Sequence, residues 1–202
     1  MLFNNKGYLM KPILGIDIDG VLADSDVKFR EGMSRFFNRE FRKEDVSEFN
    51  YEDAFDITRE QMHAFWDYFS VNGGWLDIQP LEGALESLEI LREKFQILIV
   101  TGRPPVLKDL TLEWFSKFNI KYDGFFMTNF KDKFDYLLQN GYRPEWFIED
   151  HLGFSVGLAR NGVRVLLFDY PWNRNLNDAA SENIFRVKGW KEAVQILNRG
   201  KK

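Results

Sequence analysis

Three aspartates lie close together near the start of the chain, in the stretch ILGIDIDGVLAD at residues 13–24. Asp17 and Asp19 end an apolar run, and side chains two residues apart on a strand point to the same side. Neighbouring carboxylates repel each other unless a cation or a shared proton compensates them. A divalent cation with oxygen ligands does this, and Gly20 lets the backbone turn sharply beside it. The stretch therefore favours a metal-assisted chemical site over a solvated turn, and Asp24 is expected to cap the helix that follows.

A second polar group follows another apolar run, in ILIVTGRPP. Thr101 supplies a hydroxyl and Gly102 a free backbone N–H at an expected strand-to-helix turn, and such groups suit a phosphate. Arg103 is a candidate for additional positive charge. On its own, this pattern describes an ordinary helix cap equally well.

Two further sets of charged residues occur at similar places. Lys131 and Lys133 open a helix in FKDKFDYLL, and either is a candidate to bind a phosphate, although surface lysines are usually only solvated. Glu149 and Asp150 follow the short apolar run WFI, where they fit either a metal site or an N-cap.

The elements that position these residues form an alternating pattern. Short apolar runs occur at residues 13–18, 96–100, 124–127, 146–148 and 163–168, with helical spacing between them. Buried strands that alternate with helices predict an α/β, Rossmann-like fold: a parallel sheet with helices on both faces. Since ligands bind beyond the carboxyl ends of such strands, all four groups are expected to meet at one rim of the sheet.

Residues 25–78 break the alternation, with charged helical stretches and no apolar strand run. We expect a helical insertion, in which Asp56 or Thr58 caps a helix that Gly73–Gly74 ends. The expected core is then residues 12–24 and 79–198, preceded by an N-terminal extension, residues 1–11.

Composition excludes several classes of function. The 202 residues include no cysteine and only two histidines, so thiolate metal sites, disulfides and multi-histidine centres are not expected. The formal net charge is −4, which disfavours binding to nucleic-acid polymers or anionic membranes. With no apolar run near the roughly 20 residues that span a bilayer, we expect a soluble, cytoplasmic protein. The oligomeric state stays open, with a homodimer as one option.

The four groups together resemble a known family. DIDGVLAD, VTGR, a helix-opening lysine and IEDHLGFSVGLARNGVRVLLFD are similar to the four ordered motifs of the haloacid dehalogenase (HAD) superfamily of phosphohydrolases. The stretches VLLFDYPWNR and WLDIQPLEGA further resemble the branch that contains 5′-nucleotidases and 5′(3′)-deoxyribonucleotidases. The resemblance covers the expected core.

The resemblance implies a role for each matching residue. Asp17 would be the nucleophile that forms an aspartyl-phosphate, and Asp19 would be the general acid and then the general base. The family binds Mg²⁺ through the first aspartate side chain, the second aspartate's backbone carbonyl and a fourth-motif acid, which here are Asp17, Asp19 and Asp150.

The remaining motif residues would bind the phosphoryl group. Thr101 and Gly102 would hold its oxygens, and Lys133 would balance charge. Lys133 is preferred to Lys131 because DKFDYL better matches the motif, and His151 is expected to be a polar residue at a helix start.

The insertion at 25–78 would be a helical cap over the site, which in this superfamily selects the substrate. Its aromatic residues are candidates to line a base-stacking pocket, although their spacing also describes an ordinary buried helix face: Phe65, Trp66, Phe69 and Trp75. The sequence thus predicts a Mg²⁺-dependent phosphomonoesterase with a small-molecule phosphoester substrate, and specifically a 5′-nucleotidase on (deoxy)nucleoside monophosphates. The alternatives are a phosphatase of sugar phosphates or other small metabolites, and a non-catalytic protein that binds a phosphorylated ligand.

Overall fold

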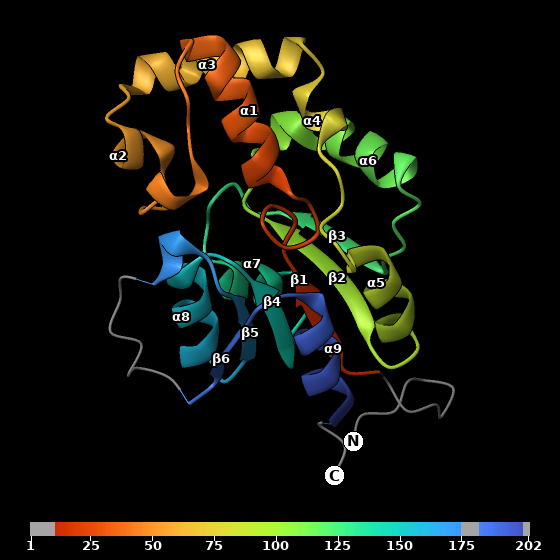
Figure 1. The fold of residues 1–202 in the computed structure, drawn as a ribbon. Helices are drawn as coiled ribbons and strands as arrows, with labels where there is room; N and C mark the ends of the chain where they lie inside the picture. The colour runs from red at the N-terminus through yellow and green to blue at the C-terminus, as the bar shows by residue number, and fades with distance from the viewer. Residues whose placement is uncertain (1–10, 175–181, 200–202) are drawn as a thin grey trace.

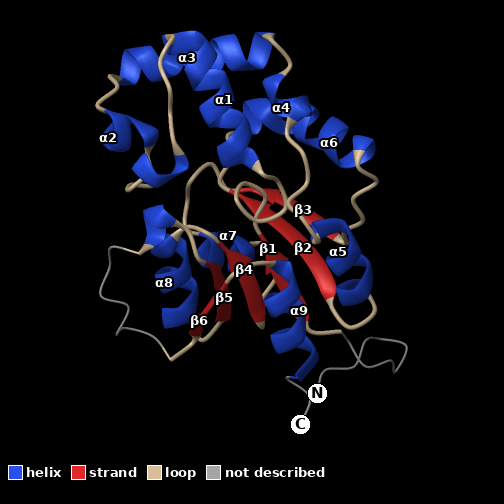
Figure 2. Ribbon diagram, viewed as in Figure 1, coloured by secondary structure: helices blue, strands red, loops and turns tan. Residues whose placement is uncertain are grey.

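The computed structural model describes residues 11–174 and 182–199, so most of the expected N-terminal extension lies outside the described residues. Its strands form a six-stranded parallel sheet in the order β3-β2-β1-β4-β5-β6 (Figure 2). The strands are β1 (Ile13–Ile16), β2 (Gln96–Thr101), β3 (Gly124–Met127), β4 (Trp146–Glu149), β5 (Arg164–Phe168) and β6 (Ile184–Val187). The expected α/β, Rossmann-like architecture is confirmed.

Helices follow the strands and cover both faces of the sheet (Figures 1 and 2). The α-helices are α1 (Ser25–Phe37), α2 (Tyr51–Phe55), α3 (Arg59–Val71), α4 (Gly74–Asp77), α5 (Ala84–Arg92), α6 (Lys108–Lys117), α7 (Lys133–Gln139), α8 (Leu152–Arg160) and α9 (Trp190–Arg199). Three short 3₁₀ helices are η1 (Lys43–Asp45), η2 (Pro105–Leu107) and η3 (Pro171–Asn173). Within the described ranges, no helix combines the length and the apolar character needed to cross a bilayer.

The apolar strand runs are buried on both sides because successive side chains point to opposite faces. In β2, Ile97 and Ile99 contribute to the core that contains buried residues of α5, α6 and α9. Leu98 and Val100 contribute to the other core, with buried residues of α7 and α8. The central strand β1 pairs with β2 on one side and β4 on the other. Chain segments that leave these three strands are therefore neighbours.

The helical segment, residues 25–78, lies between β1 and β2 and contains α1, η1, α2, α3 and α4. Figure 1 shows it gathered at the end of the sheet, with α6 beside α4. Its interior is aromatic, and Phe29 makes edge-to-face contacts at 5.0 Å with Trp66, 5.3 Å with Phe69 and 5.4 Å with Trp75. Such contacts stabilise the packing beyond the area that the rings bury.

The caps of this segment follow the sequence in part. Thr58 caps α3 in a reciprocal capping box with Gln61, which decides between the two expected caps. Asp24 occupies the N-cap position of α1, but its side chain makes no capping hydrogen bond, so that expectation was wrong.

The two ends of the helical segment run side by side as a connecting ribbon, residues 22–24 and 79–81. Asp24 N donates to Gln79 O at 2.9 Å, and Leu81 N donates to Leu22 O at 2.8 Å. Ala23 and Pro80 form an antiparallel bridge between them. The chain therefore leaves the core and returns to it at one place.

Candidate active site

Side chains from three strand ends and one helix start meet at the rim of the sheet. Asp17 directly follows β1, Thr101 ends β2, and Glu149 ends β4. Asp150 comes next in the chain, and Lys133 is the first residue of α7. The parallel register brings these positions together, as the alternating pattern predicts.

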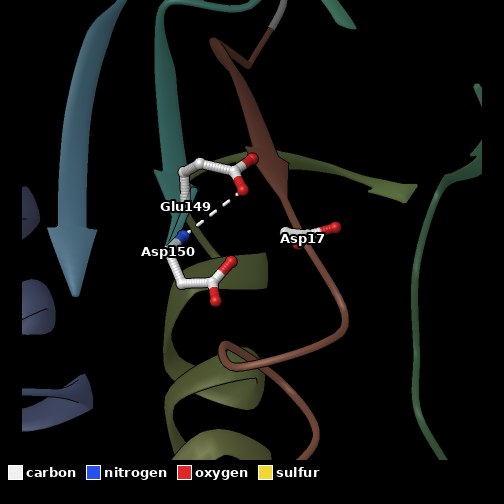
Figure 3. A group of neighbouring side chains, drawn as sticks. All are labelled: Asp17, Glu149 and Asp150. Carbon is white, nitrogen blue, oxygen red and sulfur yellow. Dashed lines mark hydrogen bonds between the residues drawn. The ribbon is translucent and has the colours of Figure 1, made fainter. Parts of the chain in front are cut away.

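Three of these residues form a buried acidic cluster: Asp17, Glu149 and Asp150 (Figure 3). One carboxylate oxygen from each lies within 4.8 Å of the other two. The exposed fractions of the three residues are 7 %, 0 % and 5 %. Carboxylates this close and this buried need a compensating cation.

Lys133 supplies part of that compensation. Its ammonium lies 2.9 Å from Asp17 Oδ1 and 2.7 Å from Glu149 Oε2, and the residue is only 1 % exposed. Burial alone would lower the pKa of Lys133, but the Asp17 and Glu149 carboxylates raise it above its usual value, so the side chain stays charged. Lys131 is exposed, so the structure favours Lys133 as the motif lysine.

Glu149 is held by other groups of the protein. Its Oε2 accepts a hydrogen bond from Lys133 Nζ, and its Oε1 accepts from the backbone N–H groups of Asp150 at 3.3 Å and His151 at 3.2 Å. Figure 3 shows its side chain turned back toward the backbone N–H of Asp150. Glu149 thus orients Lys133 and the turn that follows β4. The carboxylate oxygens of Asp17 and Asp150 are more available to bind a cation.

One lysine does not neutralise three buried acids. Burial, followed by the charges of Glu149 and Asp19, raises the pKa of Asp17 to about 7 in spite of Lys133. Burial, Glu149 and Asp17 also raise the pKa of Asp150 well above its usual range. Asp17 Oδ1 has its ion pair with Lys133, yet accepts no hydrogen bond from any described residue. An all-oxygen donor set with excess negative charge fits a hard divalent cation.

These raised pKa values predict that the metal-free protein loses stability as pH rises. Unfolded aspartate titrates near 3.8 and folded Asp17 near 7, so between these values the folded state binds more protons. The free energy of unfolding should therefore fall as pH rises through this window. Urea unfolding in EDTA, from about pH 5 to about pH 8, measures the slope. Asp17→Asn should reduce it, and a wild-type slope of zero would contradict the prediction.

Gly20 allows the loop after β1 to approach Asp150. Its φ is +73°, and a Cβ at this position would lie 2.4 Å from Asp150 Oδ2. Glycine is therefore required both by the backbone conformation and by the space beside the acidic cluster.

The expected phosphate-binding groups lie at the end of β2, the strand that pairs with β1. Thr101 is 1 % exposed, and its Oγ1 accepts a hydrogen bond from Arg103 N at 3.1 Å. Because a hydroxyl accepts and donates at once, the Thr101 proton remains available to a phosphoryl oxygen. Gly102 follows, and its carbonyl accepts from Phe130 N at 3.1 Å.

Asp19 lies next to the cluster and forms an ion pair with Arg103. Two guanidinium nitrogens each donate to a different carboxylate oxygen at 2.7 Å. The sequence suggested Arg103 only as extra charge. Its partner is 84 residues away and becomes its neighbour only because β1 pairs with β2.

The sequence reasoning missed three residues that hold the rim, two of them bonded to Asp150 and one to Gly20. Trp172 Nε1 donates to Asp150 Oδ2 at 3.2 Å, Asn173 Nδ2 donates to Asp150 O at 2.8 Å, and Tyr170 OH donates to Gly20 O at 2.9 Å. A signal was present, because the polar and aromatic run DYPWN directly follows the apolar run of β5 and so also lies at the carboxyl rim.

Two other groups of residues have packing roles. His151 is the N-cap of α8: its Nδ1 accepts from Phe154 N at 3.1 Å, and burial with Lys133 lowers its pKa to about 4, so it is neutral. The candidate pocket residues Phe65, Phe69 and Trp75 are buried, and Trp66 is half-buried against them. These four rings pack inside the helical segment, which favours a core role over a base-stacking pocket.

Comparison with known proteins agrees with this geometry. A family model described as "5' nucleotidase, deoxy (Pyrimidine), cytosolic type C protein" matches residues 11–202. "Putative nucleotidase YqfW" of Bacillus subtilis (strain 168) is 33% identical over 191 residues, 93% of this chain and 94% of that protein. A nucleotidase of Clostridium acetobutylicum is 25% identical over 185 residues, with 91% and 92% of the two chains covered.

Solved structures show the same fold at low identity. A haloacid dehalogenase-like hydrolase from Streptococcus pneumoniae has a TM-score of 0.71 at 16% identity, covering 93% of this chain and 98% of that one. A predicted phosphatase from Clostridium acetobutylicum has a TM-score of 0.67 at 16% identity, covering 95% and 100%. This chain therefore belongs to the cytosolic type C 5′-nucleotidase family, and through it to the HAD superfamily of phosphohydrolases, enzymes that hydrolyse phosphoric monoesters.

Proposed function

We propose that this chain is a Mg²⁺-dependent phosphomonoesterase that acts on nucleoside or deoxynucleoside monophosphates through an aspartyl-phosphate on Asp17. The observation that carries the proposal is the buried Asp17 carboxylate beside Asp150, whose Oδ1 is paired with Lys133 but accepts no hydrogen bond from any described residue. Such a group is poorly stabilised in the free protein and suited to attack phosphorus once its charge is balanced.

The first chemical step would transfer the phosphoryl group to Asp17. A carboxylate oxygen of Asp17 forms a bond to phosphorus while the bond to the substrate's leaving oxygen breaks. Asp19 gives its proton to that leaving oxygen. Thr101 and the Gly102 N–H donate to the phosphoryl oxygens, and Lys133 balances the developing negative charge.

The second step would restore the enzyme. Asp19, now a carboxylate, accepts a proton from a water molecule, and the resulting oxygen bonds to phosphorus. The bond between phosphorus and Asp17 breaks, so inorganic phosphate leaves and the Asp17 carboxylate is regenerated. One residue thus serves as acid in the first step and as base in the second.

Asp17, Asp150 and the Asp19 backbone carbonyl would hold the Mg²⁺. When bound, the ion neutralises the carboxylates and the phosphate dianion so that they can approach each other. The all-oxygen donors and the raised pKa values of Asp17 and Asp150 support this assignment. Trp172 and Asn173 would keep Asp150 in the orientation that it needs.

We propose that the helical segment acts as a cap on a core of residues 12–24 and 79–198. Two contacts beyond the connecting ribbon support this. The ring of Phe49 lies 4.2 Å from that of His151, and Lys43 lies 5.1 Å from the ring of Tyr170. Both partners on the core adjoin Asp150 or Gly20, so the segment touches the rim where the substrate would bind.

A phosphate-release screen tests the proposed function. The purified protein with Mg²⁺ is assayed on 5′- and 3′-nucleoside monophosphates, their deoxy forms and a set of sugar phosphates. We expect the highest kcat/KM on a nucleotide, because the family and the curated relatives are named for nucleotidases. Preference for sugar phosphates would overturn the substrate class. Tight binding without phosphate release from any compound would favour a non-catalytic binder instead.

A further inference from the structure

We propose that Arg103 is the positioning residue for Asp19, and that the proton transfer to the leaving oxygen depends on it. The inference rests on the proposed function, in which Asp19 is the general acid. It adds a residue that acts on the substrate only through another side chain.

The contacts between the two side chains fix the carboxylate in a plane. Arg103 Nε donates to Asp19 Oδ2 and Nη2 donates to Asp19 Oδ1, both at 2.7 Å. This two-bond fork restricts the rotation of the carboxylate, whereas a single contact leaves it free to turn. Each carboxylate oxygen keeps one lone pair for a proton or a substrate atom.

Arg103 is itself held from three sides. Nη1 donates to Thr111 Oγ1 at 3.2 Å, and Thr111 Oγ1 donates to Leu107 O at 2.8 Å. The guanidinium lies 5.0 Å from the ring centre of Trp75 in α4, within cation–π range. The backbone N–H of Arg103 bonds to Thr101 Oγ1, which ties it to the expected phosphate-binding turn.

Burial differs between the two partners in a way that assigns their roles. The Arg103 side chain is 5 % exposed, and the Asp19 side chain is 30 % exposed. Asp19 is therefore the member that a substrate can reach, and Arg103 is the fixed support behind it.

Position matters strongly for a general acid. Proton transfer needs heavy atoms at hydrogen-bond distance, and a misplacement of about 1 Å can cost on the order of 10²-fold in rate. Loss of the fork should therefore slow only the steps in which Asp19 moves a proton. A leaving group that needs no proton gives the test.

The experiment compares Arg103→Gln with the wild type on two substrates, in the presence of Mg²⁺. The first substrate is the best nucleotide of the screen, which is an alkyl phosphate. Its leaving group is a strongly basic alkoxide, which needs a proton. p-Nitrophenyl phosphate leaves as a weakly basic phenolate and does not. Since kcat/KM reports the steps up to the aspartyl-phosphate, we expect a loss of about 10²-fold on the nucleotide and within about fivefold on p-nitrophenyl phosphate.

Two further variants make the result specific. In an Asp19→Asn background, Arg103→Gln should cost no additional activity on the nucleotide, because both changes remove the same function. Arg103→Lys keeps the charge and loses the fork, so it should show the same selective loss, and it serves if Arg103→Gln does not fold.

Arg164 provides a matched control. It also pairs with a carboxylate, that of Glu145, and stacks on a tryptophan, Trp146, at 4.1 Å, but it begins β5 at the far end of the sheet. Arg164→Gln should leave both substrates unaffected.

Equal losses on both substrates, or an added loss in the Asp19→Asn background, would overturn only the proposed role of Arg103. The proposed function would still stand. A wild type that releases no phosphate from any compound would overturn the proposed function as well, so the two failures are distinct.

Discussion

Asp17→Asn is expected to lower phosphate release by at least about 10⁴-fold on every substrate that the wild type hydrolyses. The amide has the shape of the carboxylate but cannot form the bond to phosphorus. Asp19, Thr101 and Lys133 would remain in place, so binding of the substrate should survive. A phosphate-release assay with Mg²⁺, together with calorimetric binding of the same nucleotide, separates the two effects.

The fold of this variant should be intact or more stable. Asp17 is buried beside two other acids, and its raised pKa shows that the charged form is disfavoured there. A neutral amide relieves that repulsion, so the Tm at neutral pH should not fall. Turnover that persists within about tenfold of the wild type would mean that another group is the nucleophile.

Lys133→Met is expected to have the largest effect on stability. Methionine fills a similar volume but removes the ammonium between Asp17 and Glu149, which leaves two buried carboxylates without a cation. Removing one partner of a buried ion pair typically lowers the free energy of unfolding by about 3–5 kcal/mol. Urea unfolding in EDTA measures this loss, and activity should be lost as well because nothing balances the phosphate.

Lys131→Met is the matched control, because Lys131 is the same residue type two positions earlier and is exposed. We expect the control to keep wild-type stability and activity. Adding Glu149→Gln to Lys133→Met should recover part of the lost stability, since it removes one of the unpaired charges. If Lys131→Met were the inactive variant, Lys133 would not be the motif lysine.

The sheet could be predicted largely from the sequence, because its strands are buried on both faces. Where segments of helical spacing separate continuous apolar runs such as QILIV at residues 96–100, the runs are best explained as buried parallel strands. Strand β6 was missed because it does not have such a run. It lies at the edge of the sheet, Phe185 is exposed and Arg186 interrupts its run, so no continuous apolar signal marks it.

The site could be predicted only as far as the order of its motifs. Position after a strand end pointed to Asp17, Thr101 and Asp150, because the topology of a parallel sheet brings such positions together. Lys133 was preferred to Lys131 because DKFDYL better matches the motif, but its burial depends on the packing, and the Arg103–Asp19 pair depends on which strands are neighbours. Neither follows from spacing along the chain, and the aromatic residues of α3 fit a pocket and a core equally well on sequence alone.

The connecting ribbon also bears on how such a chain can vary in length. Because residues 22–24 and 79–81 are hydrogen-bonded to each other, the long excursion between them begins and ends at one point. The entropic cost of closing a loop grows only slowly with its length, so an excursion anchored in this way can lengthen or shorten without moving β1 or β2. The ribbon thus allows the helical segment to vary independently of the sheet. The strand ends that hold Asp17 and Thr101 can stay constant while the helices beyond the ribbon are rebuilt around a different substrate.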